Sequence, residues 1–140
     1  MKKISILCLI LIGLISIPLK LYTVDFSLPS HLDDFRFVLD AVQYNQGDFF
    51  LSQKKHPGWS LVLTPFISII DSNNFVDYSN LARGLSLVIS TVSILPMYLL
   101  ARKFFSEKYS LVAAGFFALE PHLNHNAGAA MSEPLFILCL

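Results

Sequence analysis

Two adjacent carboxylates, Asp33 and Asp34, stand in the segment HLDDFRF of a chain that otherwise has few charges. Carboxylates can serve as general bases, or can bind a cation or a phosphate-linked substrate. Neighbouring side chains on a helix point about 100° apart, so the two acids would divide such roles. Acidic side chains also stabilise the first turn of a helix by about 0.3–1 kcal/mol through the macrodipole. The residues alone therefore support a catalytic and a purely structural interpretation.

A basic segment, QKKHPGW, follows in the same loop. Lys54, Lys55 and His56 supply positive charge and hydrogen-bond donors, which a lipid phosphate at a membrane surface requires. The Pro57-Gly58 pair predicts a turn directly after them. An ordinary basic cluster beside a membrane, anchored by a tryptophan, explains the same residues. The segment is thus a candidate phosphate-binding site with a structural alternative.

Further ionisable residues stand at the ends of apolar runs. Glu133 opens one run, and an acid at the start of a membrane helix is a functional candidate, although the helix dipole also favours it. Arg83 either extends its charged head to the interface or pairs with an outer carboxylate. His122 and His125 share a helical face close to Glu120. Nothing completes a ligand shell around them, so no metal site is predicted.

Composition indicates a membrane protein. The 140 residues are 54% hydrophobic and 14% charged, well below the roughly 25% charge of soluble domains. Ten basic and ten acidic residues balance, which argues against a nucleic-acid partner and against a polybasic membrane patch. The two cysteines lie in apolar runs near opposite ends of the chain, so a structural disulfide is not expected. No nucleotide-binding or metalloprotease motif is present.

The apolar runs predict an all-α, polytopic integral membrane protein with a single membrane domain. The first run follows Lys2 and Lys3 and also fits a signal peptide, but the small residues of a cleavage site are missing, so an uncleaved span is expected. The outer loop should hold two interfacial helices, because a helical apolar face follows Asp33 and because the second run is too short to cross and contains Pro65. The predicted spans cover about 4–22, 78–101 and 109–125, with a fourth from about 133, and the outer loop 23–77 carries the interfacial helices at about 31–46 and 59–70.

Charge distribution predicts the orientation. Lys2 and Lys3 place the N-terminus in the cytoplasm under the positive-inside rule. If 59–70 only lies on the outer surface, the segment ARKFFSEK becomes a short cytoplasmic loop, in agreement with the same rule. Glu133 is then delivered to the outer, extracytoplasmic side, where Asp33 already lies. The sequence therefore predicts a multi-pass protein of the cell membrane whose acidic residues gather on its outer face.

The order LDDFRF, QGDFF, HPGW, ARGLSLVISTVSILPMYLLARKFF, SLVAAGFFALEPHL, AAMSEPLFILCL resembles the start of the GT-C glycosyltransferases, in the protein O-mannosyltransferase, ArnT-like and RgtA-D-like branch. The resemblance spans essentially the whole chain but only the front part of such an enzyme. It implies transfer of a hexose or pentose from a polyprenyl-phosphate carrier to a protein, lipid or glycan acceptor on the extracytoplasmic face. The chain departs from the family at Glu120, where relatives carry a small neutral residue, and it ends within what would be the fourth helix.

The resemblance also implies roles for individual residues. Asp33 corresponds to the catalytic base, and Asp34 completes the acidic pair that Arg36 follows. His56 corresponds to the basic residue that meets the carrier phosphate, with Lys54 and Lys55 beside it. Glu133 corresponds to the outer acid that positions the acceptor or supports the base. The expected substrate-binding residues are His56, Lys54, Lys55, Arg36 and Arg83.

The expected partners are the lipid-linked sugar donor and membrane lipids. No cofactor other than this donor is predicted, while the sugar, the acceptor, metal dependence and oligomeric state stay open. A different interpretation is a catalytically inactive, truncated membrane fragment or an accessory membrane subunit, which the reading frame beyond Leu140 would distinguish. A small transporter component is less favoured, because the polar residues gather at one face and not at the bilayer midplane.

Overall fold

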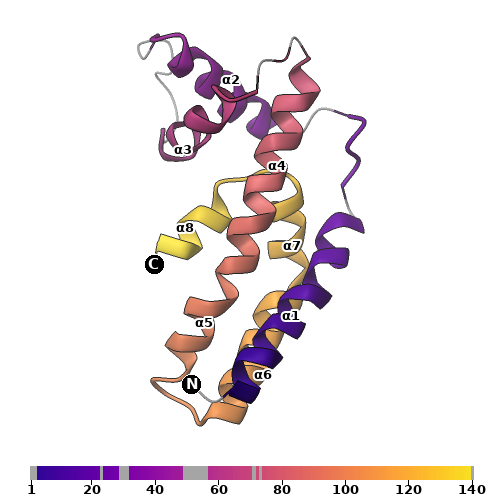
Figure 1. Ribbon diagram of the computed structural model, residues 1–140, viewed down its shortest axis with the longest axis vertical. Coiled ribbons are helices and arrows are strands. Elements are labelled where there is room, and N and C mark those ends of the chain that lie inside the picture. The colour runs from indigo at the N-terminus through magenta and orange to yellow at the C-terminus, as the bar shows by residue number, and fades with distance from the viewer. Residues whose placement is uncertain are drawn as a thin grey trace.

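A computed structural model describes residues 3–22, 24–28, 32–48, 57–70, 72 and 74–139, without the side chains of 32–34. These residues form helices and loops and contain no strand, so the predicted all-α class is confirmed. Figure 1 shows long helices side by side, with a pair of short helices at one end. The helices are α1 (Lys3–Tyr22), α2 (Leu32–Asn45), α3 (Gly58–Ile67), α4 (Phe75–Val92), α5 (Ile94–Ala101), α6 (Glu107–Leu119), α7 (Pro121–Gly128) and α8 (Glu133–Cys139).

Two of the described helices are long and apolar enough to cross a membrane. They are α1 and the nearly continuous pair α4–α5, which runs from Phe75 to Ala101. Each exceeds or reaches the roughly 20 residues that a crossing requires. The N-terminal end of α1 lies beside the start of α6, where the Ser5 hydroxyl donates a hydrogen bond to the Glu107 carboxylate.

The third expected span differs from the prediction, because the single helix predicted over 109–125 is two helices, α6 and α7, with a break at Glu120. Pro121 lacks a backbone N–H and disfavours helical backbone in the residue before it. Glu120 is accordingly extended, and its carboxylate accepts a hydrogen bond from the Leu123 amide at 2.5 Å. The unexpected acid at position 120 therefore caps α7.

On α1 and α4, the buried positions are mostly small or polar, and large aliphatic side chains face outward. On α4 the buried positions include Ser79, Ala82, Ser86 and Ser90. The buried positions of α1 are equally small or polar, whereas Leu7 and Ile15 are each 59% exposed. Small residues let helix backbones approach closely, and this arrangement is typical of helices packed within a membrane.

The short helices α2 and α3 pack against each other at the N-terminal end of α4 (Figure 1). They lie at the positions expected for the two interfacial helices, 31–46 and 59–70. Gly47 follows α2 with a φ of +86°, the left-handed conformation that commonly ends a helix. Val38 of α2, Trp59 and Leu63 of α3, and Ala82 of α4 share one buried core.

The turn between α7 and α8 joins this same core. Its residue Ala130 is fully buried and belongs to the cluster that contains Trp59. The Trp59 indole N–H donates to the Ala130 carbonyl at 2.8 Å, and the Ser86 hydroxyl donates to the Met131 carbonyl at 3.5 Å. The helix α8 then starts at Glu133, as predicted for the fourth apolar run, and packs on α4 and α7.

Candidate functional site

The predicted catalytic pair, Asp33 and Asp34, lies in the first turn of α2, and their side chains fall outside the described structure. The position of that turn is set by the next residue. The ring of Phe35 contacts the ring of Phe75 at the start of α4, with a centroid distance of 4.5 Å. The first turn of α2 therefore lies beside the N-terminal end of α4.

Arg36 and Arg83 have different environments. Arg36 is exposed on α2, where it is available to solvent or to a ligand. Arg83 is only 5% exposed. Its Nη1 donates to the carbonyls of Asp25 and Leu28, each at 3.0 Å, and to the Asn80 side-chain oxygen at 2.9 Å. These contacts attach the segment 24–28 to α4 through backbone carbonyls, and the charge of Arg83 also acts on the Asp25 carboxylate, in line with the interpretation that it pairs with an acid of this loop.

Asp25 is a charged residue of the segment 24–28 that sequence reasoning missed. Its carboxylate accepts hydrogen bonds from the Ser27 hydroxyl at 2.6 Å and from the Ser27 amide at 2.9 Å. The hydroxyl bond, the amide bond and the nearby charge of Arg83 together hold the pKa of Asp25 below its ordinary value. The sequence Asp-Phe-Ser carried the signal, because an aspartate often bonds the amide two residues later.

Glu133 is exposed at the N-terminal end of α8. It borders a cleft with Ser90 of α4, Ser93 at the junction of α4 and α5, and Asn126 of α7. The free volume of this cleft is about 10 Å³, which is roughly the space for one water molecule. A sugar does not fit inside it, so any substrate contact of Glu133 would be made from its exposed side.

The predicted phosphate-binding residues Lys54, Lys55 and His56 lie outside the described residues. The chain after them is described: α3 starts at Gly58, and Trp59 in its first turn is buried. The basic segment therefore leads directly into the helix that packs against α2.

The two histidines of α7 do not form a metal centre with other described residues. His122 and His125 are both exposed. The Nε2 atom of His122 lies 3.4 Å from the side-chain nitrogen of Asn126. Within the described part of the chain, no group of three or more potential ligands is close enough to hold a metal ion.

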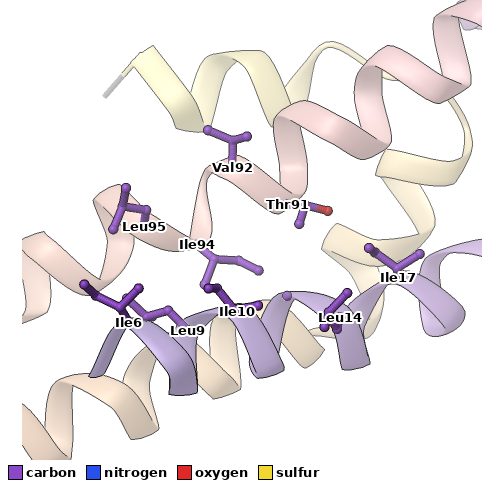
Figure 2. Close-up of a pocket in the computed structure, with 10 residues that line it drawn as sticks. Ile6, Leu9, Ile10, Leu14, Ile17, Thr91, Val92, Ile94 and Leu95 are labelled. Carbon is purple, nitrogen blue, oxygen red and sulfur yellow. The ribbon is translucent and has the colours of Figure 1, made fainter. Parts of the chain in front are cut away.

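A much larger groove lies elsewhere, between α1 and the pair α4–α5 (Figure 2). Its volume is about 520 Å³, and the described side chains that line it are aliphatic except for Gly13 and Thr91. A second hollow of about 360 Å³ continues it past Lys20, whose ammonium donates to the Thr91 hydroxyl at 3.1 Å. The groove contains none of the predicted site residues. Its apolar lining suits a hydrocarbon chain, and the groove is not a candidate for the catalytic site.

The structure thus brings several predicted elements to one end of the bundle. The N-terminal half of α4 is contacted by the first turn of α2, the segment held by Arg83, the start of α3 and the turn before Glu133. Comparison of the chain with protein-family models, with curated proteins and with solved structures gives no match.

Proposed function

We propose that this chain carries the acidic outer loop of a membrane glycosyltransferase, which transfers a sugar from a polyprenyl-phosphate carrier to an acceptor outside the cytoplasm. The observation that carries the proposal is the buried core that α2, α3, the N-terminal half of α4 and the turn before α8 share. Trp59 and Ala130 belong to that core together with Val38 of α2. The helix that bears Asp33 and the turn that leads to Glu133 are therefore packed together, although they are about 100 residues apart in the sequence.

The proposal includes several membrane crossings with a cytoplasmic N-terminus. It is supported by the two helices of sufficient length and by the outward-facing aliphatic side chains of α1. A cysteine replacing Asp77 should react with a membrane-impermeant thiol reagent in intact cells, whereas one replacing Arg102 should react only after permeabilisation. The background for both would lack Cys8 and Cys139. The reverse labelling pattern would contradict the orientation.

In the proposed reaction, an acceptor hydroxyl attacks the anomeric carbon of the sugar in a single inverting displacement. A bond forms between the acceptor oxygen and that carbon while the bond from the carbon to the carrier phosphate breaks. Asp33 accepts the proton of the hydroxyl, a role that contributes roughly 10²–10⁴-fold to rates. The departing polyprenyl phosphate is stabilised by the cations Lys54, Lys55 and His56. Glu133 orients the acceptor.

The test is a transfer assay with radiolabelled polyprenyl-phosphate sugars on membranes from cells that express the intact gene. We expect Asp33→Asn to lower transfer by at least about 100-fold, in line with the loss of a general base. Asp77→Asn is the matched control, because Asp77 is an exposed acid at the same end of the molecule and bonds only the Ser72 hydroxyl among its described contacts. Protein amount in the membrane fraction should be equal for both variants.

Two results would contradict the proposal. Full transfer by Asp33→Asn would remove this residue from the mechanism. An absence of transfer by the unaltered protein with every donor tested would favour the alternative, a membrane subunit without catalytic activity of its own.

A further inference from the structure

We propose that Trp59 is a positioning residue for Glu133. The indole N–H of Trp59 fixes the backbone turn from which α8 starts, and so determines where the acid stands relative to α3. The inference rests on the proposed function only in assigning Glu133 a role in transfer. The mechanical part, that this hydrogen bond holds the turn, stands on the geometry alone.

The turn after α7 has the hydrogen bonds of a Schellman motif. The Met131 amide donates to the Asn126 carbonyl at 3.2 Å, and the Ala130 amide donates to the Ala127 carbonyl at 3.4 Å. In this motif the residue at the position of Ala130 adopts a left-handed conformation and is usually glycine. Ala130 has a φ of +58°. An alanine here makes the turn less favourable by itself than a glycine would, so contacts from outside the turn contribute to holding it.

Trp59 supplies such a contact from a distant part of the chain. Its side chain is 2% exposed, and Ala130 is fully buried. Within the motif, the amide of Ala130 is already used, and its carbonyl accepts the indole N–H at 2.8 Å. A buried carbonyl that loses its donor is costly, because no water replaces it. The bond therefore favours the one turn geometry in which this carbonyl points at α3.

The turn is close enough to Glu133 to determine its position. Only Met131 and Ser132 separate Ala130 from Glu133, so their Cα atoms lie within about 11 Å of each other along the chain. The first hydrogen bond of α8 follows at once, from the Phe136 amide to the Ser132 carbonyl at 3.1 Å. A shift of the Ala130 backbone therefore moves Glu133 with it.

Trp59 also stands three residues after His56, at the start of α3. One hydrogen bond consequently links the first turn of α3 to the turn that precedes α8, the helix that starts with Glu133.

The alternative is that Trp59 serves the core only through the area of its ring. Trp59→Phe separates the two, because phenylalanine keeps an aromatic ring in the core and removes the N–H donor. Tyr78→Phe is a matched control. The Tyr78 hydroxyl also donates to a loop carbonyl, that of Ser72 at 2.7 Å, and this bond does not involve the turn before α8.

The first measurement follows the turn itself in the whole protein. A single cysteine replaces Ser132, which is half-buried, in a background with Cys8→Ser and Cys139→Ser. We expect Trp59→Phe to raise the rate of thiol labelling at this position several-fold and Tyr78→Phe to leave it unchanged. An unchanged rate in Trp59→Phe would overturn the proposal, whatever the activity of the protein.

The second measurement is a double-mutant cycle on sugar transfer with Trp59→Phe and Glu133→Gln. Trp59→Phe should lower kcat roughly 10-fold with little change in the KM for the donor, and should lower it no further when Glu133→Gln is already present, because residues that act as one unit are not additive. Additive losses would overturn the link to Glu133. The unaltered protein could transfer no sugar although Trp59→Phe labels faster at position 132. The proposed function would then be wrong, whereas the inference that Trp59 holds the turn would stand.

Discussion

Replacement of Arg83 by methionine should cost the protein more stability than replacement of any exposed arginine. Methionine keeps much of the apolar stem of the side chain and removes the guanidinium that attaches residues 24–28 to α4. The segment would then lose its bonds from Asp25 and Leu28 to the helix. This segment connects α1 to α2, so the first turn of α2 would also be less firmly placed.

The expected loss of stability follows from the hydrogen bonds of one atom, Nη1 of Arg83. Nη1 carries two hydrogens and faces three acceptors, namely two backbone carbonyls and the Asn80 side chain. Two full bonds are therefore the upper count, and each bond to a charged donor contributes about 1.5–3 kcal/mol. We expect Arg83→Met to lower the free energy of unfolding by up to about 3–6 kcal/mol, with Arg83→Lys intermediate.

The measurement is equilibrium unfolding in mixed micelles with increasing SDS, followed by the fluorescence of Trp59, the single tryptophan of the chain. Arg102→Met is the control, because Arg102 is exposed at the end of α5, where a substitution should change stability by less than about 0.5 kcal/mol. Equal losses in Arg83→Met and Arg102→Met would refute the reasoning. A raised donor KM in Arg83→Met at unchanged stability would instead support the predicted role of Arg83 in substrate binding.

Three further outcomes are expected from local contacts. The folded pKa of Asp25 is lowered, so its bonds with Ser27 stabilise the protein above the ordinary aspartate pKa of about 3.9 and are lost as the pH falls through the lower folded value. The stability difference between the unaltered protein and Ser27→Ala, measured by pH-dependent unfolding, should therefore shrink below about pH 4. A difference that grows below this pH would contradict the expectation. Glu120→Ala removes the cap of α7 and should cost about 0.5–2 kcal/mol, whereas Glu120→Asp should cost less; equal losses in SDS unfolding would argue against capping. Ala130→Gly should change stability by less than about 1 kcal/mol, because relief of the left-handed conformation offsets the lost methyl group. Ala129→Gly should destabilise the protein, because Ala129 has a φ of −84° and gains no such relief. The opposite order of stabilities in SDS unfolding would contradict the assigned turn.

Local signals in the sequence were sufficient for some elements. The helix expected over 31–46 corresponds to α2, because an apolar helical face and the terminating Gly47 both lie within the segment itself. The start of α8 at Glu133 was likewise predicted from an acid that precedes an apolar run. In both cases the decisive interactions join residues within a few positions of one another.

Interactions between distant residues could not be read in the same way. Arg83 bonds carbonyls 55 and 58 residues away, and Trp59 bonds a carbonyl 71 residues away. Backbone carbonyls carry no side-chain identity, so no residue type in the sequence marks them as partners. Lys20 is a further example, since its bond to Thr91 spans 71 residues and nothing near Lys20 indicates that it is buried.

The break within the predicted third span has a consequence for the acidic site. Pro121 was visible in the sequence, yet a crossing to about 125 was expected because the apolar run that ends before Glu120 is too short to span a membrane. In the structure, Glu120 starts α7 on its own axis, and the turn at Ala130 brings α8 back against α4. Both ends of α7 therefore determine where Glu133 stands. If this is correct, Glu120→Ala should raise thiol labelling at a cysteine in place of Ser132 as Trp59→Phe does, because a change at either end of α7 reaches the same turn.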